Sequence, residues 1–342
     1  MPRILVCSYL EPQWLDAIRA VDPRVEVTFR PDLIPAPRFV ADHDGAPFVR
    51  DEPRRAAWAA LMRDADVLFD FDRTDPESLL RDGLAVRWVQ ATSAGIGEYV
   101  ERHGLQRPGL TLTTASGVHA RPLAEFVLWG MLAFAKSYPL ARRQQREGVW
   151  RLFVCGELEG ATLAVVGLGA IGREVARLAR AVGMRVIGTK RTLDGASPAD
   201  LGVDALVHWD DRARWLGEAD HVCLVMPHTR ETAGTVDAAT IAAMRRGSVL
   251  INIGRGSAVD ERALLDALAS GHLAGAVLDV APHEPLPADH PLWSMDNVIV
   301  YPHSAATSVR ENERLTDLFC DNLRRWLDGR PLRNVYRPER QY

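Results

Sequence analysis

The chain has 342 residues, a formal net charge of −4 at pH 7, and 47% hydrophobic and 25% charged residues. This length predicts about two domains, and this composition is typical of a soluble globular protein. Lysine and arginine are spread along the sequence, which excludes a basic nucleic-acid-binding or membrane-binding surface. The longest apolar run, residues 126–135, is too short to span a bilayer. The four cysteines lie far apart, so we expect reduced thiols and a cytoplasmic location.

The first third of the chain alternates short apolar runs with helical patterns, which predicts a small parallel α/β sheet. The expected strands cover residues 4–8, 25–29, 67–71, 86–90 and 110–113, and the expected helices cover 12–20, 58–63 and 77–81. Residues 31–54 interrupt this alternation with five prolines and the sequence Asp42-His43-Asp44-Gly45. Two interpretations of this long excursion stay open, a solvent-exposed insertion and a flap over an active site.

A loop of small residues, 91–97, comes after the strand expected at 86–90. Its backbone N–H groups are unobstructed, and the carboxyl edge of a parallel sheet is where open α/β sheets bind ligands. Ser93, Ala94 and Gly95 are therefore candidates for holding a substrate carboxylate. The alternative is a tight turn that binds nothing.

The stretch from Leu158 to Thr192 predicts a strand, a glycine-rich turn, a helix and a second strand. The strands are expected at 162–166 and 184–188, with apolar residues spaced as on one helix face between them. Glycines in such a turn let the backbone approach a pyrophosphate, which then binds at the positive end of the helix. The candidate contacts are Gly167, Gly169, Ala170, Ile171 and Gly172. The alternative is a glycine-rich turn in some other α/β unit.

Four more expected strands, at 221–226, 248–253, 275–280 and 298–301, bring this second unit to six, the number in a full Rossmann sheet. A last helix, expected at 307–329, returns to the first domain. The helix expected at 120–138 is apolar nearly all round, so it needs cover on most sides. We expect a homodimer built around this helix; the alternative is its burial between the two domains.

Three polar residues lie just after expected strands of the second unit. Arg255 offers a planar fork for a carboxylate and a carbonyl oxygen. His303 titrates near neutral pH and can protonate an oxygen whose carbon receives a hydride. Glu284 beside it would stabilise the imidazolium form. Singly, each residue is explained by a surface ion pair or a helix end; together, after a dinucleotide motif, they indicate a reductase.

In these stretches the chain resembles the D-isomer-specific 2-hydroxyacid dehydrogenase family. The resemblance is carried, in this order, by residues 166–172, 250–260, 275–280 with 284–287, and 302–303. It implies that Arg255, Glu284 and His303 are catalytic and that Asp279 contacts the nicotinamide. It also implies that the substrate is bound by Ser93, Ala94, Gly95, Arg255 and His303.

The resemblance further implies a fold and an activity. A Rossmann nucleotide-binding domain, 117–307, would be inserted in a flavodoxin-like substrate-binding domain, 1–116 and 308–342. The enzyme would transfer a hydride between NAD(P)H and a small 2-keto acid, such as glyoxylate or hydroxypyruvate, to give the D-2-hydroxy acid. No metal is expected. A cofactor-sensing corepressor of the same fold and a phosphite or formate dehydrogenase remain alternatives.

The cofactor is predicted from the residues just after the second strand of the nucleotide unit. An NAD site of this type has Asp or Glu there, whereas this chain has Thr189-Lys190-Arg191. A hydroxyl and two cations suit the 2′-phosphate of NADP, so we expect NADP to be preferred, with NAD possible. Alternatively, the cations only solvate a strand end. The remaining expected cofactor contacts are Pro227, Thr232, Ile253, Gly254, Asp279 and His303.

The sequence departs from the family pattern at two further positions. Gly95-Ile96-Gly97 lacks the acidic residue that the family commonly has in this loop, and Tyr301 replaces a small threonine before Pro302-His303. The larger ring is expected to reshape the floor of the site.

Overall fold

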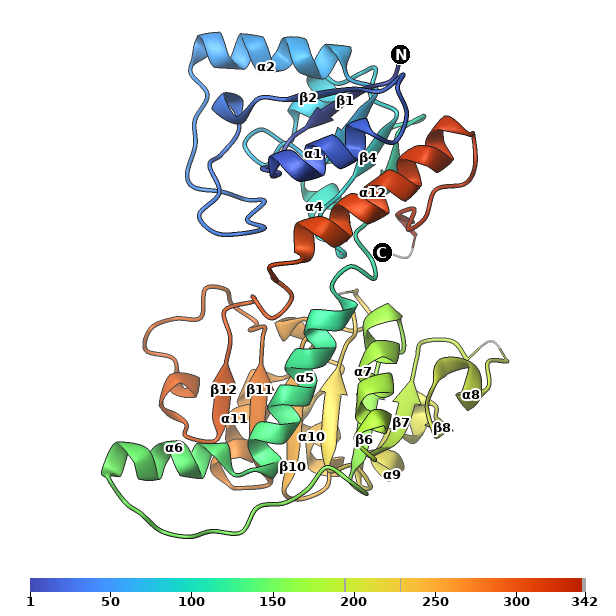
Figure 1. Cartoon of the computed structure of the whole chain (residues 1–342). Helices are drawn as coiled ribbons and strands as arrows, with labels where there is room; N and C mark the ends of the chain where they lie inside the picture. Colours follow the sequence, from blue (N-terminus) through green and yellow to red (C-terminus); the bar gives the residue numbers. More distant parts are fainter. Residues whose placement is uncertain (194, 228, 340–342) are drawn as a thin grey trace. The chain divides into compact units, whose positions relative to one another are not determined.

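The computed structural model describes residues 1–193, 195–227 and 229–339 (Figure 1). Two compact units share the chain: Met1–His119 with Thr307–Tyr342 form unit 1, and Ala120–Ala306 form unit 2. Each unit holds a parallel sheet with helices on both faces, which confirms the α/β prediction. No helix within the described residues combines the length and apolar character needed to cross a membrane.

Unit 1 contains a five-stranded sheet of order β2-β1-β3-β4-β5. Its strands are β1 (Arg3–Val6), β2 (Glu26–Phe29), β3 (Val67–Phe69), β4 (Trp88–Gln90) and β5 (Thr111–Thr113). This is the strand order of flavodoxin-like sheets, in which ligands bind outside the carboxyl ends of the strands. The loops after β3 and β4 therefore lie at the edge where a ligand is expected.

Helices cover both faces of the unit 1 sheet because its strands are apolar on both sides. Ile4 and Val6 of β1 pack with α1 (Pro12–Arg19) and α12 (Glu311–Leu327), while Leu5 between them packs on the opposite face. That opposite face is covered by α2 (Glu52–Asp64), α3 (Ser78–Arg81) and α4 (Gly97–Arg102). The last helix, α12, thus packs in unit 1.

The excursion at 31–54 is anchored in unit 1 by several buried residues, while Phe39, Val40 and Val49 within it are more than half exposed. It contains a short 3₁₀ turn, η1 (Pro31–Leu33), and α2 begins before it ends. Leu33 and Ile34 are buried in the core below α2. Arg50 is buried as well and forms a bidentate ion pair with Asp72.

Unit 2 contains a seven-stranded sheet of order β12-β11-β10-β9-β6-β7-β8. Its strands are β6 (Thr162–Val166), β7 (Arg185–Thr189), β8 (Ala205–Leu206), β9 (His221–Leu224), β10 (Ser248–Asn252), β11 (Leu273–Leu278) and β12 (Val298–Val300). The order is that of a Rossmann sheet with one strand added at an edge. The expected number of six strands is wrong, because the two-residue strand β8 is too short to leave a periodic signal.

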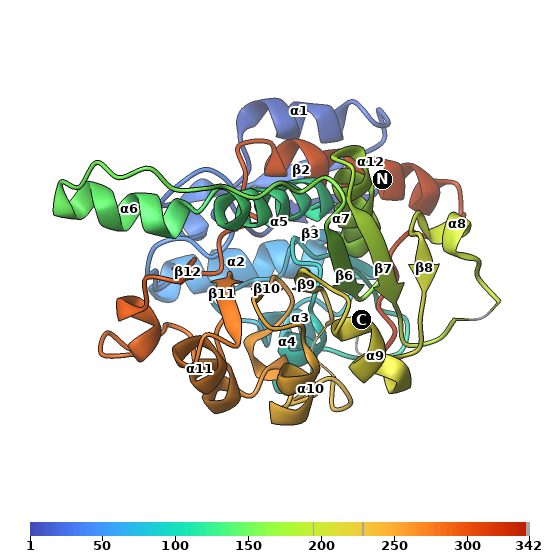
Figure 2. The same cartoon turned by 90° about the horizontal axis from the view of Figure 1, so that it is seen from below.

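Two layers of helices enclose this sheet (Figure 2). On one face lie α5 (Ala120–Ala135) and α7 (Ala170–Ala181), and on the other lie α9 (Arg212–Leu216), α10 (Ala238–Ala243) and α11 (Glu261–Ala269). The remaining short elements are α8 (Pro198–Leu201), η2 (Trp209–Asp211), η3 (Gly256–Ala258) and η4 (Pro291–Ser294). The packing of α5 is close, since a Cβ on Gly130 would lie 3.1 Å from Val277.

The helix expected at 120–138 ends three residues earlier than expected, and a second helix that the sequence analysis did not predict begins at Tyr138. The first, α5, ends at Ala135, and Ser137 has a left-handed backbone with φ of 52°. The second, α6 (Tyr138–Glu147), starts with Pro139 in its first turn and projects from the body of unit 2 (Figure 1). Proline fits a first helical turn but not a helix interior, which explains the break.

Candidate active site

The turn between β6 and α7 is built around glycines that the fold itself requires. Gly167 has φ of 114°, and a Cβ there would lie 2.9 Å from the carbonyl oxygen of Val225. A Cβ on Gly172 would collide with the carbonyl oxygen of Gly167. Larger residues would therefore force the strand, the turn and the helix apart.

Gly169 needs a different explanation, because a Cβ there would meet nothing within 4 Å. It is the N-cap of α7, with ordinary backbone angles and no side chain capping the helix. The first N–H groups of a twelve-residue helix, including those of Ala170 and Ile171, thus face an open space. An uncapped helix start of this kind fits a dinucleotide pyrophosphate, and a Cβ on Gly169 would point into the open space.

The loop after β7 carries the residues expected to select the cofactor. Thr189 is the last residue of β7 and is buried, with a hydroxyl that has no partner within the described chain. A hydroxyl so enclosed is a poorer phosphate ligand than the two cations beside it. Lys190 is half-buried and Arg191 is exposed. Arg191 forms a 2.7 Å ion pair with Glu231, which sequence reasoning did not single out.

Pro227 and Thr232 lie together in the loop after β9. The Thr232 hydroxyl donates to the carbonyl oxygen of Pro227 at 2.7 Å and accepts from the backbone N–H of Thr229 at 2.8 Å. These bonds close a tight turn beside the glycine-rich turn, since β9 pairs with β6. Thr232 therefore shapes this loop.

Arg255 is positioned by the turn after β10. The side chain of Asn252 accepts from the N–H of Gly254 and donates to the carbonyl oxygen of Arg255, both at 3.1 Å. A Cβ on Gly254 would lie 2.7 Å from the carbonyl oxygen of Met226, and Gly256 packs against the backbone of Ala281. Ile253 is buried beside them. The half-buried Arg255 directs Nη1 to the Gly254 carbonyl at 2.7 Å.

His303 and Glu284 form a direct pair. Nδ1 of His303 lies 2.8 Å from Oε2 of Glu284, while the other carboxylate oxygen accepts from the N–H of Ala281 at 3.0 Å. The two side chains are 45% and 39% exposed, so they are accessible to a substrate. His303 has φ of 53°, a left-handed conformation in which its N–H bonds to the carbonyl oxygen of Asp279 at 2.8 Å.

Asp279 holds the chain that follows the histidine. One oxygen of its buried carboxylate accepts from the N–H groups of Ser304 and Ala305, both at 2.9 Å. Burial raises the pKa of this carboxyl group, partly opposed by the bond from Ala305. The residue expected to contact the nicotinamide thus also fixes the His303 loop.

The structure brings the three expected catalytic residues to one edge of the unit 2 sheet. Strands β10, β11 and β12 are neighbours, and Arg255, Glu284 and His303 come after them in that order. Their guanidinium, carboxylate and imidazole groups can bind a carboxylate, orient a histidine and donate a proton. Among the described residues, no group of three or more His, Cys, Asp or Glu side chains could hold a metal ion.

The ring of Tyr301 is accommodated by packing against α5. Its ring lies edge-on to that of Phe126, with the ring centroids 4.8 Å apart, and its centroid is 5.7 Å from that of Trp129. The tyrosine at this position is therefore a neighbour of the helix that the sequence links to dimerisation.

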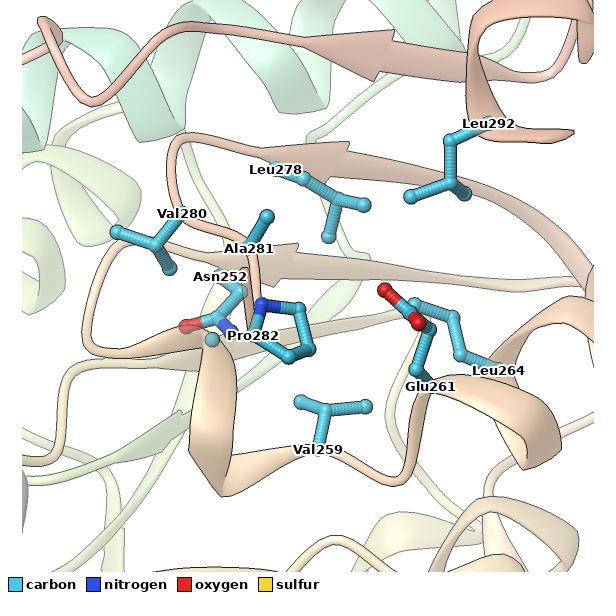
Figure 3. A pocket seen from close by; sticks show the side chains of 10 residues that line it. Asn252, Val259, Glu261, Leu264, Leu278, Val280, Ala281, Pro282 and Leu292 are labelled. Carbon is cyan, nitrogen blue, oxygen red and sulfur yellow. The ribbon is translucent and has the colours of Figure 1, made fainter. Parts of the chain in front are cut away.

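A small apolar cavity lies behind the Arg255 turn, lined by residues that include Asn252, Val259, Leu278 and Pro282 (Figure 3). Its volume is about 20 Å³, enough for one water molecule at most. It is a gap in the packing beneath the catalytic loops rather than a substrate site.

Ser93, Ala94 and Gly95 lie in unit 1, in the loop between β4 and α4. The carbonyl oxygen of Ser93 accepts from the N–H of Ala115 at 3.0 Å, which fixes the loop. Nη2 of Arg73 reaches the Ser93 hydroxyl at 3.4 Å. Sequence reasoning missed Arg73, although its place just after β3, at the same sheet edge, was a usable signal.

A Rossmann sheet with an open glycine cradle, together with an Arg, Glu and His set at adjacent strand ends, defines an NAD(P)-dependent oxidoreductase acting on a carbonyl–hydroxyl pair. Residues 128–305 match the family model for the NAD binding domain of D-isomer specific 2-hydroxyacid dehydrogenases. The chain belongs to this family. The predicted family, enzyme class and NAD(P) binding are thereby confirmed, and the substrate is a 2-keto or 2-hydroxy acid.

Individual proteins of this family are similar to the chain in sequence and in structure. The chain is 34% identical to the (S)-sulfolactate dehydrogenase of Chromohalobacter salexigens, over 80% of this chain and 96% of that protein. It is 31% identical to the glyoxylate reductase of Korarchaeum cryptofilum, over 83% and 87%. A crystal structure of a D-isomer specific 2-hydroxyacid dehydrogenase from Xanthobacter autotrophicus Py2, in complex with NADPH and MES, matches with a TM-score of 0.79 at 29% identity, over 100% and 99% of the two chains.

Proposed function

We propose that the enzyme reduces a small 2-keto acid, such as glyoxylate or hydroxypyruvate, to the D-2-hydroxy acid, with NADPH preferred. The 2.8 Å pair between His303 and Glu284, which follow the two strands next to that of Arg255, carries this proposal. The glyoxylate reductase among the relatives supports the substrate class.

Arg255 binds the substrate carboxylate and polarises the adjacent carbonyl oxygen, because its planar fork offers paired donors. NAD(P)H, when bound, supplies the hydride to the carbonyl carbon. His303 gives a proton from Nε2 to the oxygen, since Nδ1 is engaged by Glu284. Glu284 orients the ring through the contact with Nδ1. In unit 1, Ser93 and the backbone N–H groups of Ala94 and Gly95 supply the proposed carboxylate contacts.

The test is a panel of 2-keto acids with NADPH, followed at the nicotinamide absorbance band. His303→Ala should lower the rate on the best substrate by about 10²- to 10⁴-fold, the usual contribution of a general acid. His290 offers a matched control in the same unit, because it also pairs with a glutamate, Glu261, at 3.2 Å. Near-normal turnover by His303→Ala, or an equal loss in His290→Gln, would refute the assignment.

The NADPH preference rests on Lys190 and Arg191 after β7. They place two positive charges where the 2′-phosphate is expected, and a carboxylate that would repel it is absent from Thr189, Lys190 and Arg191. The NADPH complex of the similar Xanthobacter protein supports this choice. The ratio of kcat/KM for NADPH and NADH tests it, and an unchanged ratio in Arg191→Ala would contradict it.

We assign nucleotide binding to residues 117–307, with Gly167, Gly169, Ala170, Ile171, Gly172, Pro227, Thr232, Ile253, Gly254, Asp279 and His303 as contacts. Residues 1–116 and 308–342 form the proposed substrate-binding domain. Hydrogen exchange on the whole enzyme separates these roles, because NADPH alone should protect backbone amides of 167–173. Protection confined to unit 1 would overturn the assignment.

A homodimer is proposed from the apolar surface of α5 and of the segment after α6. Trp129 and Leu132 on α5 are each 39% exposed, and Trp150, Leu152 and Val154 are at least nine-tenths exposed. Such a patch on one unit marks an interaction site, and a second copy would cover it. Light scattering should give a dimer mass, and Leu152→Asp should give a monomer.

Leu84 is a matched control for that substitution, because it is exposed but lies in unit 1. Leu84→Asp should leave the mass unchanged, and a monomeric wild type would refute the dimer.

The cytoplasmic location remains a proposal, supported by the free state of Cys7, Cys155, Cys223 and Cys320. Cell fractionation of the native protein tests it.

A further inference from the structure

Arg73 lies beside the loop that is proposed to bind the substrate carboxylate, yet the proposed reaction gives it no role. It follows β3, and Ser93 follows β4, the neighbouring strand of the unit 1 sheet. Parallel neighbours end at a common edge, so these two loops lie side by side. Nη2 of Arg73 is directed at the Ser93 hydroxyl, with the nitrogen 3.4 Å from the oxygen.

The guanidinium of Arg73 is held by two carboxylates and an aromatic ring. Nη2 lies 3.5 Å from Oδ1 of Asp70, and Nη1 lies 3.5 Å from Oδ1 of Asp44. Cζ lies over the ring of Tyr99, 5.1 Å from the ring centroid. Because the two carboxylates already balance the charge of Arg73, nothing here favours a further anion bound to Arg73 itself.

Asp70 connects Arg73 to the backbone of the carboxylate-binding loop. It is fully buried and has φ of 67°, a left-handed conformation that is costly for a residue with a side chain. The oxygen that pairs with Arg73 also accepts from the N–H of Thr92, the residue before Ser93, at 3.4 Å. Burial alone would raise the pKa of Asp70, but Arg73 and other neighbours bring it below its ordinary value, so the carboxylate is ionised.

The Ser93 hydroxyl has its hydrogen available. A serine hydroxyl has one hydrogen to donate and two lone pairs that accept, whereas a guanidinium only donates. The contact with Arg73 therefore uses a lone pair of the serine oxygen, and no described residue accepts the hydroxyl hydrogen. Ser93 and Ala94 are half-buried and Gly95 is exposed, so a ligand can reach this part of the loop.

We propose that Arg73 is a positioning residue for substrate binding that acts through Ser93. By donating to the serine oxygen, Arg73 turns the hydroxyl hydrogen away from itself and toward the substrate carboxylate, which can only accept. The hydroxyl also becomes a stronger donor, since hydrogen bonds in a chain polarise one another. The inference rests on the proposed function, because that function makes Ser93 a carboxylate contact.

The test is a double-mutant cycle in the whole enzyme, with the Kd of oxalate measured by titration calorimetry. Oxalate has the carboxylate of a 2-keto acid and an oxygen on the adjacent carbon but accepts no hydride, so it reports binding even without turnover. Ser93→Ala should raise the Kd by about 10- to 100-fold, the usual contribution of a hydrogen bond to a charged group.

Arg73→Lys keeps a positive charge beside Asp70, but an ammonium has no planar fork to contact Asp70 and Ser93 together. It should raise the Kd of oxalate at least about fivefold in the wild-type background and less than about twofold in the Ser93→Ala background. The KM for the best 2-keto acid should follow the Kd of oxalate, while the KM for NADPH should stay within about twofold of wild type.

Arg107→Lys is the matched control. Arg107 is also half-buried in unit 1 and, like Arg73, has a buried Nε without a partner among the described residues. Its Nη2 donates to the carbonyl oxygens of Gly83 and Val86, which precede β4 and so lie at the opposite edge of the sheet. The substitution should leave the Kd of oxalate within about twofold of wild type.

The cycle separates failure of this inference from failure of the proposed function. An equal effect of Arg73→Lys with and without the Ser93 hydroxyl would overturn the inference, and so would no effect of Arg73→Lys where Ser93→Ala weakens binding. No effect of Ser93→Ala, or no binding of oxalate to wild type up to roughly 20 mM, would overturn the Ser93 contact as well. The expected pattern with oxalate, but no reduction of any 2-keto acid, would support the role of Arg73 and refute the proposed reaction.

Discussion

The ion pair between Arg191 and Glu231 gives the sharpest prediction about cofactor choice. It joins the loop after β7 to the loop after β9, the strands that flank β6 and its glycine-rich turn. Arg191 is the proposed partner of the 2′-phosphate, yet its Nη2 is bound to a carboxylate at 2.7 Å. NADPH must share Arg191 with Glu231 or displace it, so Glu231→Gln should strengthen NADPH binding.

The size of the effect is the sum of two terms. The pair itself is weak, because its side chains are 55% and 63% exposed and such surface pairs contribute about 0–1 kcal/mol. Repulsion adds to this: a carboxylate about 6 Å from a doubly charged phosphate in water costs roughly 1 kcal/mol after salt screening. The two terms together amount to about 1–2 kcal/mol, so removing both should lower the KM for NADPH by about five- to thirtyfold.

The assay compares KM and kcat for NADPH and NADH in wild type and Glu231→Gln at low and high ionic strength. NADH lacks the phosphate, so its KM should stay within about twofold of wild type, and added salt should shrink the NADPH effect. Glu218→Gln is the matched control, because Glu218 forms a similar exposed pair with Arg185 at 3.0 Å on the same unit. An unchanged NADPH KM, or an equal gain for NADH, would show that Glu231 does not compete with the phosphate.

Three further predictions concern the fold and the cradle. Gly169→Ala should change the unfolding free energy by no more than about 0.5 kcal/mol, because the added Cβ meets nothing, yet it should raise the KM for NADPH at least about tenfold. A normal KM would show that the pyrophosphate does not bind beside Gly169. Burial lowers the pKa of His221 to about 4, so the unfolded state binds more protons between that value and about 6.5. Stability should therefore fall by about 3 kcal/mol as the pH drops through this window, and urea unfolding of His221→Leu should lose that dependence. Asn322 is fully buried and bonds to the side chain of Gln90 and the backbone of Arg333, so Asn322→Ala should cost about 2–3 kcal/mol in the same assay, and a loss below about 0.5 kcal/mol would contradict this reasoning.

Much of unit 2 could be predicted because its signals are local. Strand β6 agrees with the expected range residue for residue, since a buried parallel strand is a continuous apolar run bounded here by glycine. The positions of Arg255, Glu284 and His303 obey one rule, that parallel strands end at a common edge. This rule predicts that the three residues lie at the same edge of the sheet, and it requires no knowledge of their side-chain contacts.

The missed features depend on partners distant in sequence. Nothing near Arg50 indicates burial, and its environment exists only because Asp72 and Trp58 are brought to it by the fold. The same is true of Glu231, whose partner is Arg191 on another loop. Helix α6 was not predicted either, whereas α5 ends only three residues before the predicted end at Tyr138, which lies next to Pro139.

The glycine-rich turn shows most clearly what structure adds to a motif. The sequence motif treats Gly167, Gly169 and Gly172 alike, and the need for glycine at each position could come from packing or from a bound ligand. In the structure, Gly167 and Gly172 are enclosed by the backbone of the protein itself, so they would be needed even if no nucleotide were bound. Gly169 alone faces open space at the start of α7, so packing gives no reason for a glycine there. A bound pyrophosphate is therefore inferred from this one residue, and the matched substitutions Gly169→Ala and Gly172→Ala separate loss of the ligand from loss of the fold.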